Sequence, residues 1–100
     1  MNAYDWTVYV DDNFHFMDET ERYIEGNFST YDAAVATCRN IIDRFLLSTE
    51  AATAEALYDL YKMFGEDPWI EGPIPCREGQ SFRAFDYALR RCSELHSKAL

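Results

Sequence analysis

The sequence has few glycines and few basic residues, and each shortage excludes a class of function. Its four glycines are scattered, so no glycine-rich loop is present to hold a phosphate group. Nine Lys and Arg stand against 18 Asp and Glu, and the net charge of −9 disfavours direct binding to nucleic acid or to an anionic membrane surface. No apolar run approaches the roughly 20 residues of a membrane-spanning helix. Residues 1–6 contain no basic run and no apolar core follows them, so we expect no signal peptide.

Cysteine is also scarce. The three cysteines, Cys38, Cys76 and Cys92, are an odd number with wide spacing, and Cys38 and Cys92 fall on predicted apolar helix faces. Reduced, buried thiols in the cytoplasm are the simplest interpretation.

Hydrophobic residues are plentiful, at 48% of the 100 residues, and predict a single folded domain over residues 1–100. The longest pattern spans 29–47 and predicts a helix capped by Ser29 or Thr30, with Asp32 in its first turn. Its apolar positions follow the spacing of one helix face: Tyr31, Ala34, Val35, Cys38, Ile41, Ile42, Phe45 and Leu46.

Two segments before this helix alternate with a period of two, which is typical of half-buried strands. The first spans 4–11 and turns its even-numbered residues inward. The second spans 21–28, with Ile24 and Phe28 inward and a possible bulge at Gly26. They predict an antiparallel hairpin. In its long connection, either the first strand continues to Phe16, or the loop folds back and tucks Phe14, Phe16 and Met17 underneath; the second arrangement is favoured.

Two more helices are predicted after the long one. Thr53 caps a helix from Ala54 to about Phe64, which Gly65 ends in a left-handed conformation. Ser81 caps the last helix. We expect the apolar face of this last helix to comprise Phe82, Phe85, Leu89, Cys92 and His96. The apolar face of the helix from Ala54 to about Phe64 is expected to comprise Leu57, Tyr58, Tyr61 and Phe64. Trp69 either lies in a very short edge strand or plugs one end of the core. The predicted fold class is therefore α+β, an N-terminal antiparallel hairpin packed on three helices.

Acidic charge is concentrated near the N-terminus. Residues 1–32 contain eight acidic residues and one Arg, whereas residues 81–100 contain two acidic and four basic residues. The candidate interaction surface comprises Asp11, Asp12, His15, Asp18, Glu19, Glu21 and Trp69. This acidic loop suits a basic partner protein, although the same charge also serves solubility.

Signatures of catalysis and of metal binding are weak. Asp11 and Asn13 match the first and third positions of a calcium loop, but Phe16 and Arg22 occupy the positions that need Gly and Glu. A metal or enzymatic site would have to combine His15 and Asp18 with Glu66 and Asp67. A Cys76–histidine dyad and a zinc site of the three cysteines with a histidine have no supporting spacing. We therefore expect no cofactor.

Several runs resemble a family of short bacterial proteins of about 100 residues. They are the opening Tyr-Val-Asp-Asp-Asn-Phe-His-Phe-Met-Asp-Glu of residues 9–19, followed by Glu21-Arg22-Tyr23, then residues 61–68 and 84–88. The resemblance implies a bacterial cytoplasmic setting and, because the family has no assigned activity, no catalytic residues.

The composition and the missing signatures together favour a small, non-catalytic protein that binds another protein or a second copy of itself. Its seven tyrosines are many amphipathic rings for one small core, and such rings are frequent at interfaces. A homodimer is therefore one expectation. The alternative is the metal-dependent or enzymatic module of His15, Asp18, Glu66 and Asp67.

Overall fold

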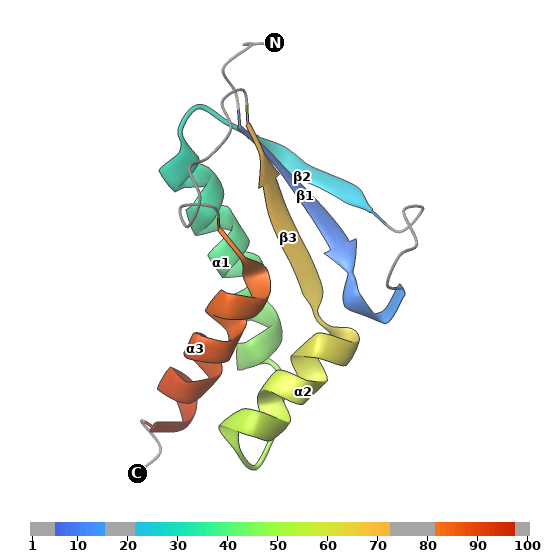
Figure 1. Cartoon of the computed structure of the whole chain (residues 1–100), viewed down its shortest axis with the longest axis vertical. Helices are drawn as coiled ribbons and strands as arrows, with labels where there is room; N and C mark the ends of the chain where they lie inside the picture. Colours follow the sequence, from blue (N-terminus) through green and yellow to red (C-terminus); the bar gives the residue numbers. More distant parts are fainter. Residues whose placement is uncertain (1–5, 16–21, 73–81, 98–100) are drawn as a thin grey trace.

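The computed structural model describes residues 6–15, 22–72 and 82–97 and has an α+β fold. Three antiparallel strands form a sheet in the order β2-β1-β3, and β1 and β2 form the N-terminal hairpin. In Figure 1 the helices lie to the left of the sheet and below it. In chain order the elements are β1 (Trp6–Asp12), the 3₁₀ helix η1 (Asn13–His15), β2 (Tyr23–Phe28), α1 (Tyr31–Leu47), α2 (Ala54–Phe64), β3 (Glu66–Glu71) and α3 (Ala84–Ser97).

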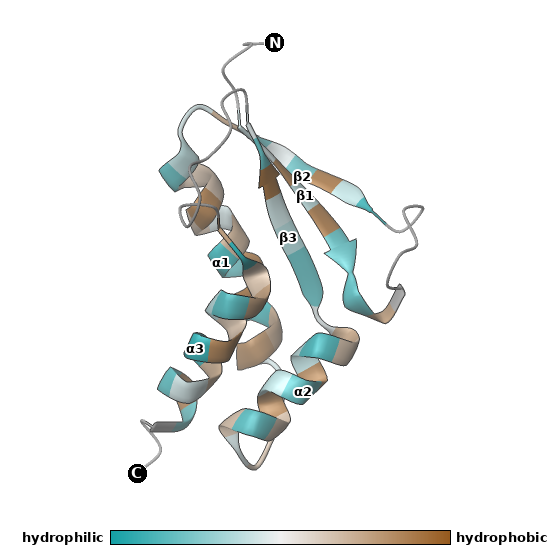
Figure 2. Ribbon diagram, viewed as in Figure 1, coloured by the Kyte–Doolittle hydropathy of each residue, from teal (hydrophilic) through white to brown (hydrophobic). Residues whose placement is uncertain are grey.

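Helix α1 joins the two parts of the core, as its broad apolar stripe predicts. Its N-terminal half covers the sheet, where Ala34, Cys38 and Ile41 pack with Val8 and Val10 of β1. Its C-terminal half packs with α2 and α3 in a second cluster: Ile42, Leu46, Leu57, Tyr61, Ala84, Ala88 and Cys92. Figure 2 shows hydrophobic and hydrophilic residues alternating along the strands and around the helices. The stripe thus packs on strands at one end and on helices at the other.

The N-caps predicted for α1 and α2 are confirmed, with Thr30, one of the two candidates, at α1 and Thr53 at α2. The Thr30 hydroxyl accepts a hydrogen bond from the Ala33 amide at 3.1 Å, and the Thr53 hydroxyl accepts one from the Ala56 amide at 3.0 Å. Each bond satisfies an amide that has no partner within the helix. The predicted cap at Ser81 lies outside the described residues.

A β-bulge in β2 overturns the predicted facing of Ile24. Val8 pairs with Gly26 and Tyr9 with Ile24, so Glu25 is an extra residue in β2. The extra residue turns Ile24 to the same side as Tyr9, and its side chain is 59% exposed. Phe28 does pack on the core.

Three other local predictions are wrong. Phe64 and Leu89 are 48% and 52% exposed, because α2 and α3 are turned so that Leu57, Tyr61 and the small residues of α3 face the core. Gly65 is extended, with φ −77° and ψ −179°, and is not left-handed.

The connection after β1 follows neither predicted course in the part that is described. The strand ends at Asp12, whose carboxylate accepts a hydrogen bond from the Phe14 amide at 2.8 Å, and η1 follows. The Phe14 side chain is 62% exposed and is not tucked under the sheet. Phe16 and Met17 lie outside the described residues.

Candidate functional site

One face of the sheet carries none of the three helices. Side chains directly opposite each other in an antiparallel ladder lie on the same side of the sheet, and they alternate along each strand. The strand pairing therefore assigns one set of side chains to the side opposite Val8 and Val10. We call this side the outer face; it comprises Thr7, Tyr9, Asp11, Ile24, Asn27, Asp67, Trp69 and Glu71, together with Arg22, which precedes β2 and contacts Asp11 and Trp69.

An aromatic pair forms the centre of the outer face. Tyr9 and Trp69, which are partners in the β1–β3 ladder, stack with their ring centroids 4.6 Å apart and an interplanar angle of 20°. The guanidinium of Arg22 lies 5.1 Å from the centroid of the Trp69 ring, within the range of a cation–π interaction. Trp69 is half-buried and belongs to neither core cluster. Trp69 therefore lies in an edge strand, as one of its two predicted roles has it, although β3 is six residues long; Trp69 does not plug the core, whereas its neighbour Ile70 packs on the core.

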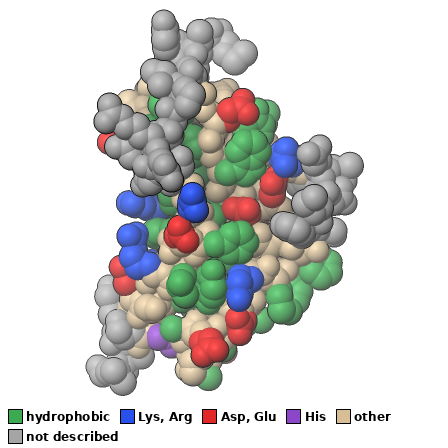
Figure 3. Space-filling model, in the orientation of Figure 1, with side chains coloured by type: hydrophobic (Ala, Val, Ile, Leu, Met, Phe, Trp, Pro, Cys, Tyr) green, Lys and Arg blue, Asp and Glu red, His purple; other side chains and the backbone are tan. Residues whose placement is uncertain are grey.

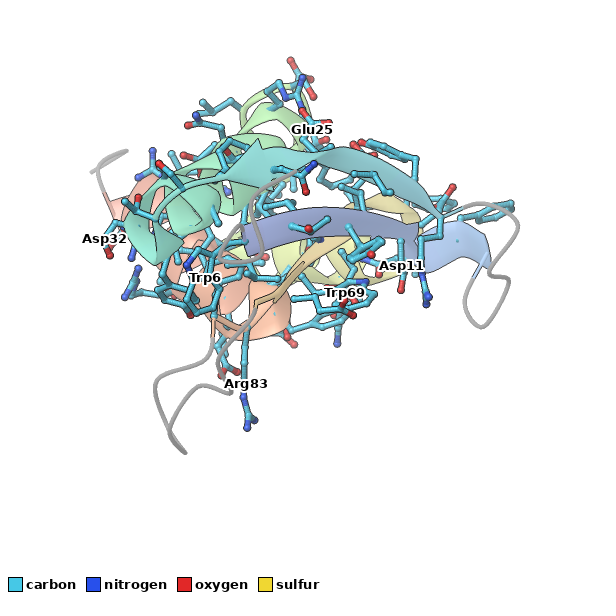
Figure 4. The ribbon with its side chains drawn as sticks, turned by 90° about the horizontal axis from the view of Figure 1, so that it is seen from above. Trp6, Asp11, Glu25, Asp32, Trp69 and Arg83 are labelled. Atoms are coloured by element: carbon cyan, nitrogen blue, oxygen red, sulfur yellow. The ribbon has the colours of Figure 1, made fainter. Side chains whose placement is uncertain are left out.

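Arg22 also binds a carboxylate. Its Nε lies 2.6 Å from Asp11 Oδ1, and its second contact is Nη2 to Oδ2 at 3.2 Å. This bidentate pairing fixes the guanidinium over the indole ring. Figure 4 labels Trp69 and Asp11, which lie near each other beside β1 and β3.

Asp67 lies opposite Asp11 in the β1–β3 ladder. Burial of its carboxyl, together with the negative charge of Asp11, raises the pKa of Asp67 from 3.8 to about 6. Ionised Asp67 is therefore destabilising at neutral pH, and a neighbouring cation would relieve that cost. Carboxyls with raised pKa values are frequent at functional sites.

The effect of Asp67 on stability has a definite pH dependence. Because its pKa is higher in the folded state, the folded chain binds the proton more tightly, and stability falls as the pH rises from about 4 to about 6. We expect Asp67→Asn to raise the free energy of unfolding by about 1–2 kcal/mol at pH 7, given partial exposure.

Urea titrations at several pH values measure this difference. The gain from Asp67→Asn should shrink toward pH 4 and disappear near pH 3, below the unfolded pKa, where the carboxyl is protonated in both states. Glu71→Gln, on the same strand and face but exposed, is the matched control and should give no gain that follows the same curve. An equal gain from Asp67→Asn at pH 4 and pH 8 would contradict the assignment to ionisation.

The predicted acidic surface is only partly assembled in the described residues. Asp11 and Trp69 share the outer face, but Asp12, the next residue in the strand, points to the other side. The η1 backbone includes His15, whose side chain is outside the description, and Asp18, Glu19 and Glu21 lie in residues that the structure does not describe.

The carboxylates of the predicted enzymatic alternative do not form a pair. Asp67 is on the outer face, whereas Glu66 points to the opposite side and accepts a hydrogen bond from the Tyr23 hydroxyl at 2.7 Å. No group of three His, Cys, Asp or Glu side chains that could hold a metal occurs within residues 6–15, 22–72 and 82–97. Cys38 and Cys92 are free and buried in different clusters, and burial raises the pKa of the Cys38 thiol to about 12. Cys76 lies outside the described residues.

Other surface features are less organised. Figure 3 shows hydrophobic side chains among acidic and basic ones on the visible face. The exposed Phe14 ring of η1 stacks on that of Phe64 at the end of α2, with centroids 5.6 Å apart. One open hollow, between the α1–α2 connection and α3, is lined by residues including Leu46, Leu57 and His96. A second lies along α1 next to Glu25. The first is also lined by Thr49, whose hydroxyl donates a hydrogen bond to the Phe45 carbonyl at 2.7 Å rather than to a base.

Sequence reasoning missed Tyr9, Arg22, Ile24 and Asp67 as members of one surface. The aromatic Tyr9 was the available signal, because it is the one large ring among the polar, outward positions of its strand. Its partner could not be identified without the register of β3 against β1.

Two findings bear on the kind of protein this is. In the part of the chain that the structure describes, no helix combines the length and apolar character that crossing a membrane requires. Comparisons with models of known protein families, with curated proteins and with solved structures gave no match, so the function has to be argued from the outer face itself.

Proposed function

We propose that the chain is a small, non-catalytic binding domain that associates with a basic segment of another protein through the outer face. The observation that carries the proposal is the stacked Tyr9–Trp69 pair on a sheet face that none of the three helices covers. Aromatic rings that are held rigidly and left partly exposed are the usual centres of protein interfaces. The free, buried thiols of Cys38 and Cys92 support a cytoplasmic location for the protein.

The charges of the outer face favour a basic ligand. Asp11 is paired with Arg22, but Asp67 and Glu71 form no ion pair with any basic side chain in the described ranges. Asp67 and Glu71 are four residues apart on β3, so each would take its own Lys or Arg from a partner, and a cation beside Asp67 would favour its ionised form. Ile24, 59% exposed at the edge of the same face, adds an apolar contact.

Nuclear magnetic resonance titration with short peptides that combine Arg with aliphatic residues tests the proposal. The two tryptophans give an internal comparison, because Trp69 is on the outer face and Trp6 packs on the opposite side with the core. The indole N–H signal of Trp69 should shift on binding while that of Trp6 stays in place. Shifts confined to Trp6, or no saturable shift with any peptide, would refute a binding role for the outer face.

Substitution of Ile24 measures the apolar contribution. We expect Ile24→Thr to weaken peptide binding by about tenfold, which corresponds to about 1.4 kcal/mol for a contact that becomes buried. Threonine keeps the β-branched shape that suits a strand. Leu89→Thr is the control, because Leu89 is similarly exposed but lies on α3. Equal losses in the two variants would show that binding does not depend on the outer face.

A further inference from the structure

A second charged surface, basic in sign, lies where α3 packs on α1. Its centre is Tyr87. Two guanidinium groups lie near the centroid of the Tyr87 ring, that of Arg39 at 5.6 Å and that of Arg90 at 5.4 Å. Arg83 directly precedes α3 and lies one turn before Tyr87, and Arg91 lies one turn after Tyr87 on α3. We call Arg39, Arg83, Tyr87, Arg90 and Arg91 the Tyr87 surface. In Figure 3 basic side chains gather on the left of the molecule, next to α3.

Of the acidic groups around the Tyr87 surface, Asp43 and Glu94 are engaged, whereas Asp86, next to Tyr87 on α3, is exposed and forms no ion pair among the described residues. Asp43 of α1 accepts a hydrogen bond from the Tyr87 hydroxyl at 2.8 Å and one from Arg91 Nε at 3.2 Å. Glu94 lies 3.4 Å from Arg91 and 3.9 Å from Arg90. These bonds hold the ring and Arg91 in place, and they leave most of the charge of Arg90 directed to solvent.

Arg39 and Arg83 have still less compensation. Both are exposed, and neither forms an ion pair with a carboxylate among residues 6–15, 22–72 and 82–97. Figure 4 shows Arg83 extending away from the body of the molecule, well apart from Asp11 and Trp69. A chain of net charge −9 therefore presents a local excess of cations on one side and unpaired carboxylates on another.

We propose that the Tyr87 surface docks on the outer face of a second copy of this chain. The proposal rests on the binding role of the outer face and names its partner. The guanidinium groups of one copy would approach Asp67 and Glu71 of the next, beside the Tyr9–Trp69 pair, on which a guanidinium can also stack. Opposite charges on the two surfaces favour this arrangement over contacts of like with like.

The two surfaces differ, so the contact is head-to-tail. A bound pair keeps one free surface of each kind, one on each copy, and such contacts build open chains or closed rings rather than a two-fold symmetric dimer. Association carried by exposed charges also weakens as salt screens them, over a Debye length of about 10 Å in 0.1 M salt and about 3 Å in 1 M salt.

Sedimentation velocity of the full chain at increasing concentration tests the proposal. The average mass should exceed that of a monomer in about 0.1 M salt and return toward it in about 1 M salt. Arg39→Glu combined with Arg90→Glu should weaken association at least tenfold. The matched control, Arg44→Glu combined with Lys62→Glu, makes the same change of charge at exposed positions elsewhere and should leave association unchanged.

Mixing two deficient variants gives the sharpest result. The Arg39→Glu/Arg90→Glu variant has lost its Tyr87 surface, and an Asp67→Asn/Glu71→Gln variant has lost the acidic charge of its outer face. Each alone should be monomeric, and an equimolar mixture should form a dimer and nothing larger, because each partner supplies the one intact surface that the other needs. A wild-type chain that stays monomeric at low salt, or a mixture that stays monomeric, would overturn the proposal.

The peptide titration separates the two ways of failing. If the wild-type chain is monomeric but the Trp69 signal still responds to Arg-containing peptides, the second copy is the wrong partner and the outer face remains a binding site. If neither self-association nor peptide binding occurs, both proposals are wrong.

Discussion

Replacing Tyr61 with alanine is expected to lower the free energy of unfolding by about 4 kcal/mol, a large part of the roughly 5–15 kcal/mol that stabilises a domain. Tyr61 is fully buried and lies between the rings of Phe45 and Phe85, with centroids 5.9 and 5.6 Å away, both edge-on. Its hydroxyl donates a hydrogen bond to the Glu66 carbonyl at 2.6 Å. The substitution therefore leaves a cavity between α2 and α3 and removes the tie between α2 and the start of β3.

Chemical denaturation of Tyr61→Ala beside Tyr58→Ala measures this effect. Tyr58 is the same residue type on the same helix but is only half-buried, and we expect a loss of about 1 kcal/mol there. Tyr61→Phe separates packing from hydrogen bonding, because it keeps the ring and leaves the Glu66 carbonyl without that donor, at a cost of about 1–2 kcal/mol. Similar losses for Tyr61→Ala and Tyr58→Ala would contradict a central role for the Tyr61 ring.

Replacing Gly65 with alanine should cost about 3 kcal/mol, the second large effect. The backbone of Gly65 is extended and would tolerate any residue, so the conformation is not the reason. A Cβ at this position would overlap the ring of the buried Tyr61 and come within 2.8 Å of its carbonyl oxygen. Since neither the buried ring nor the backbone can yield easily, the added methyl group overpacks the junction of α2 and β3.

The matched control for Gly65→Ala is Gly26→Ala in β2. A Cβ there comes no closer than 3.4 Å to the Phe28 ring, which is near ordinary contact. Alanine reduces the freedom of the unfolded chain, so Gly26→Ala should be neutral or stabilise by up to about 1 kcal/mol. Relative to the wild type, the thermal unfolding midpoint should fall for Gly65→Ala and stay the same or rise for Gly26→Ala. An unchanged midpoint for Gly65→Ala would show that α2 and β3 separate without cost.

The long-period patterns of the sequence were sufficient to predict the elements, and tertiary packing decided the details. Helix α1 was predictable because its stripe repeats over four turns and Thr30 supplies a cap. Ile24 was assigned to the wrong face because a single extra residue, Glu25, changes the facing of every residue before it in β2. The sequence indicated a bulge at Gly26, one residue from the observed extra residue, but the facing that results depends on the register against β1.

The candidate site was less predictable than the fold. The sequence identified Asp11 and Trp69, which lie 58 positions apart in the printed chain, but their proximity follows from the pairing of β1 with β3. Arg22 was absent from the predicted surface because its role comes from holding Asp11 and Trp69 at once. Leu89 was assigned to the buried face of α3 for a similar reason. The rotation of α3 is set by the small residues Ala84, Ala88 and Cys92, which allow the helix to pack closely on its neighbours.

The position of β1 at the centre of the sheet has a consequence for how the protein folds as it is synthesised. The strand leaves the ribosome first, but one of its two neighbours, β3, begins only at Glu66. Until then one edge of β1 has no partner, and Val8 and Val10 lack the cover of Pro68 and Ile70. Pairing across such a separation is slow, and unpaired edges favour aggregation. The nascent chain therefore passes through a vulnerable stage, and the step that ends it, the docking of β3, also brings Trp69 onto Tyr9 and completes the outer face.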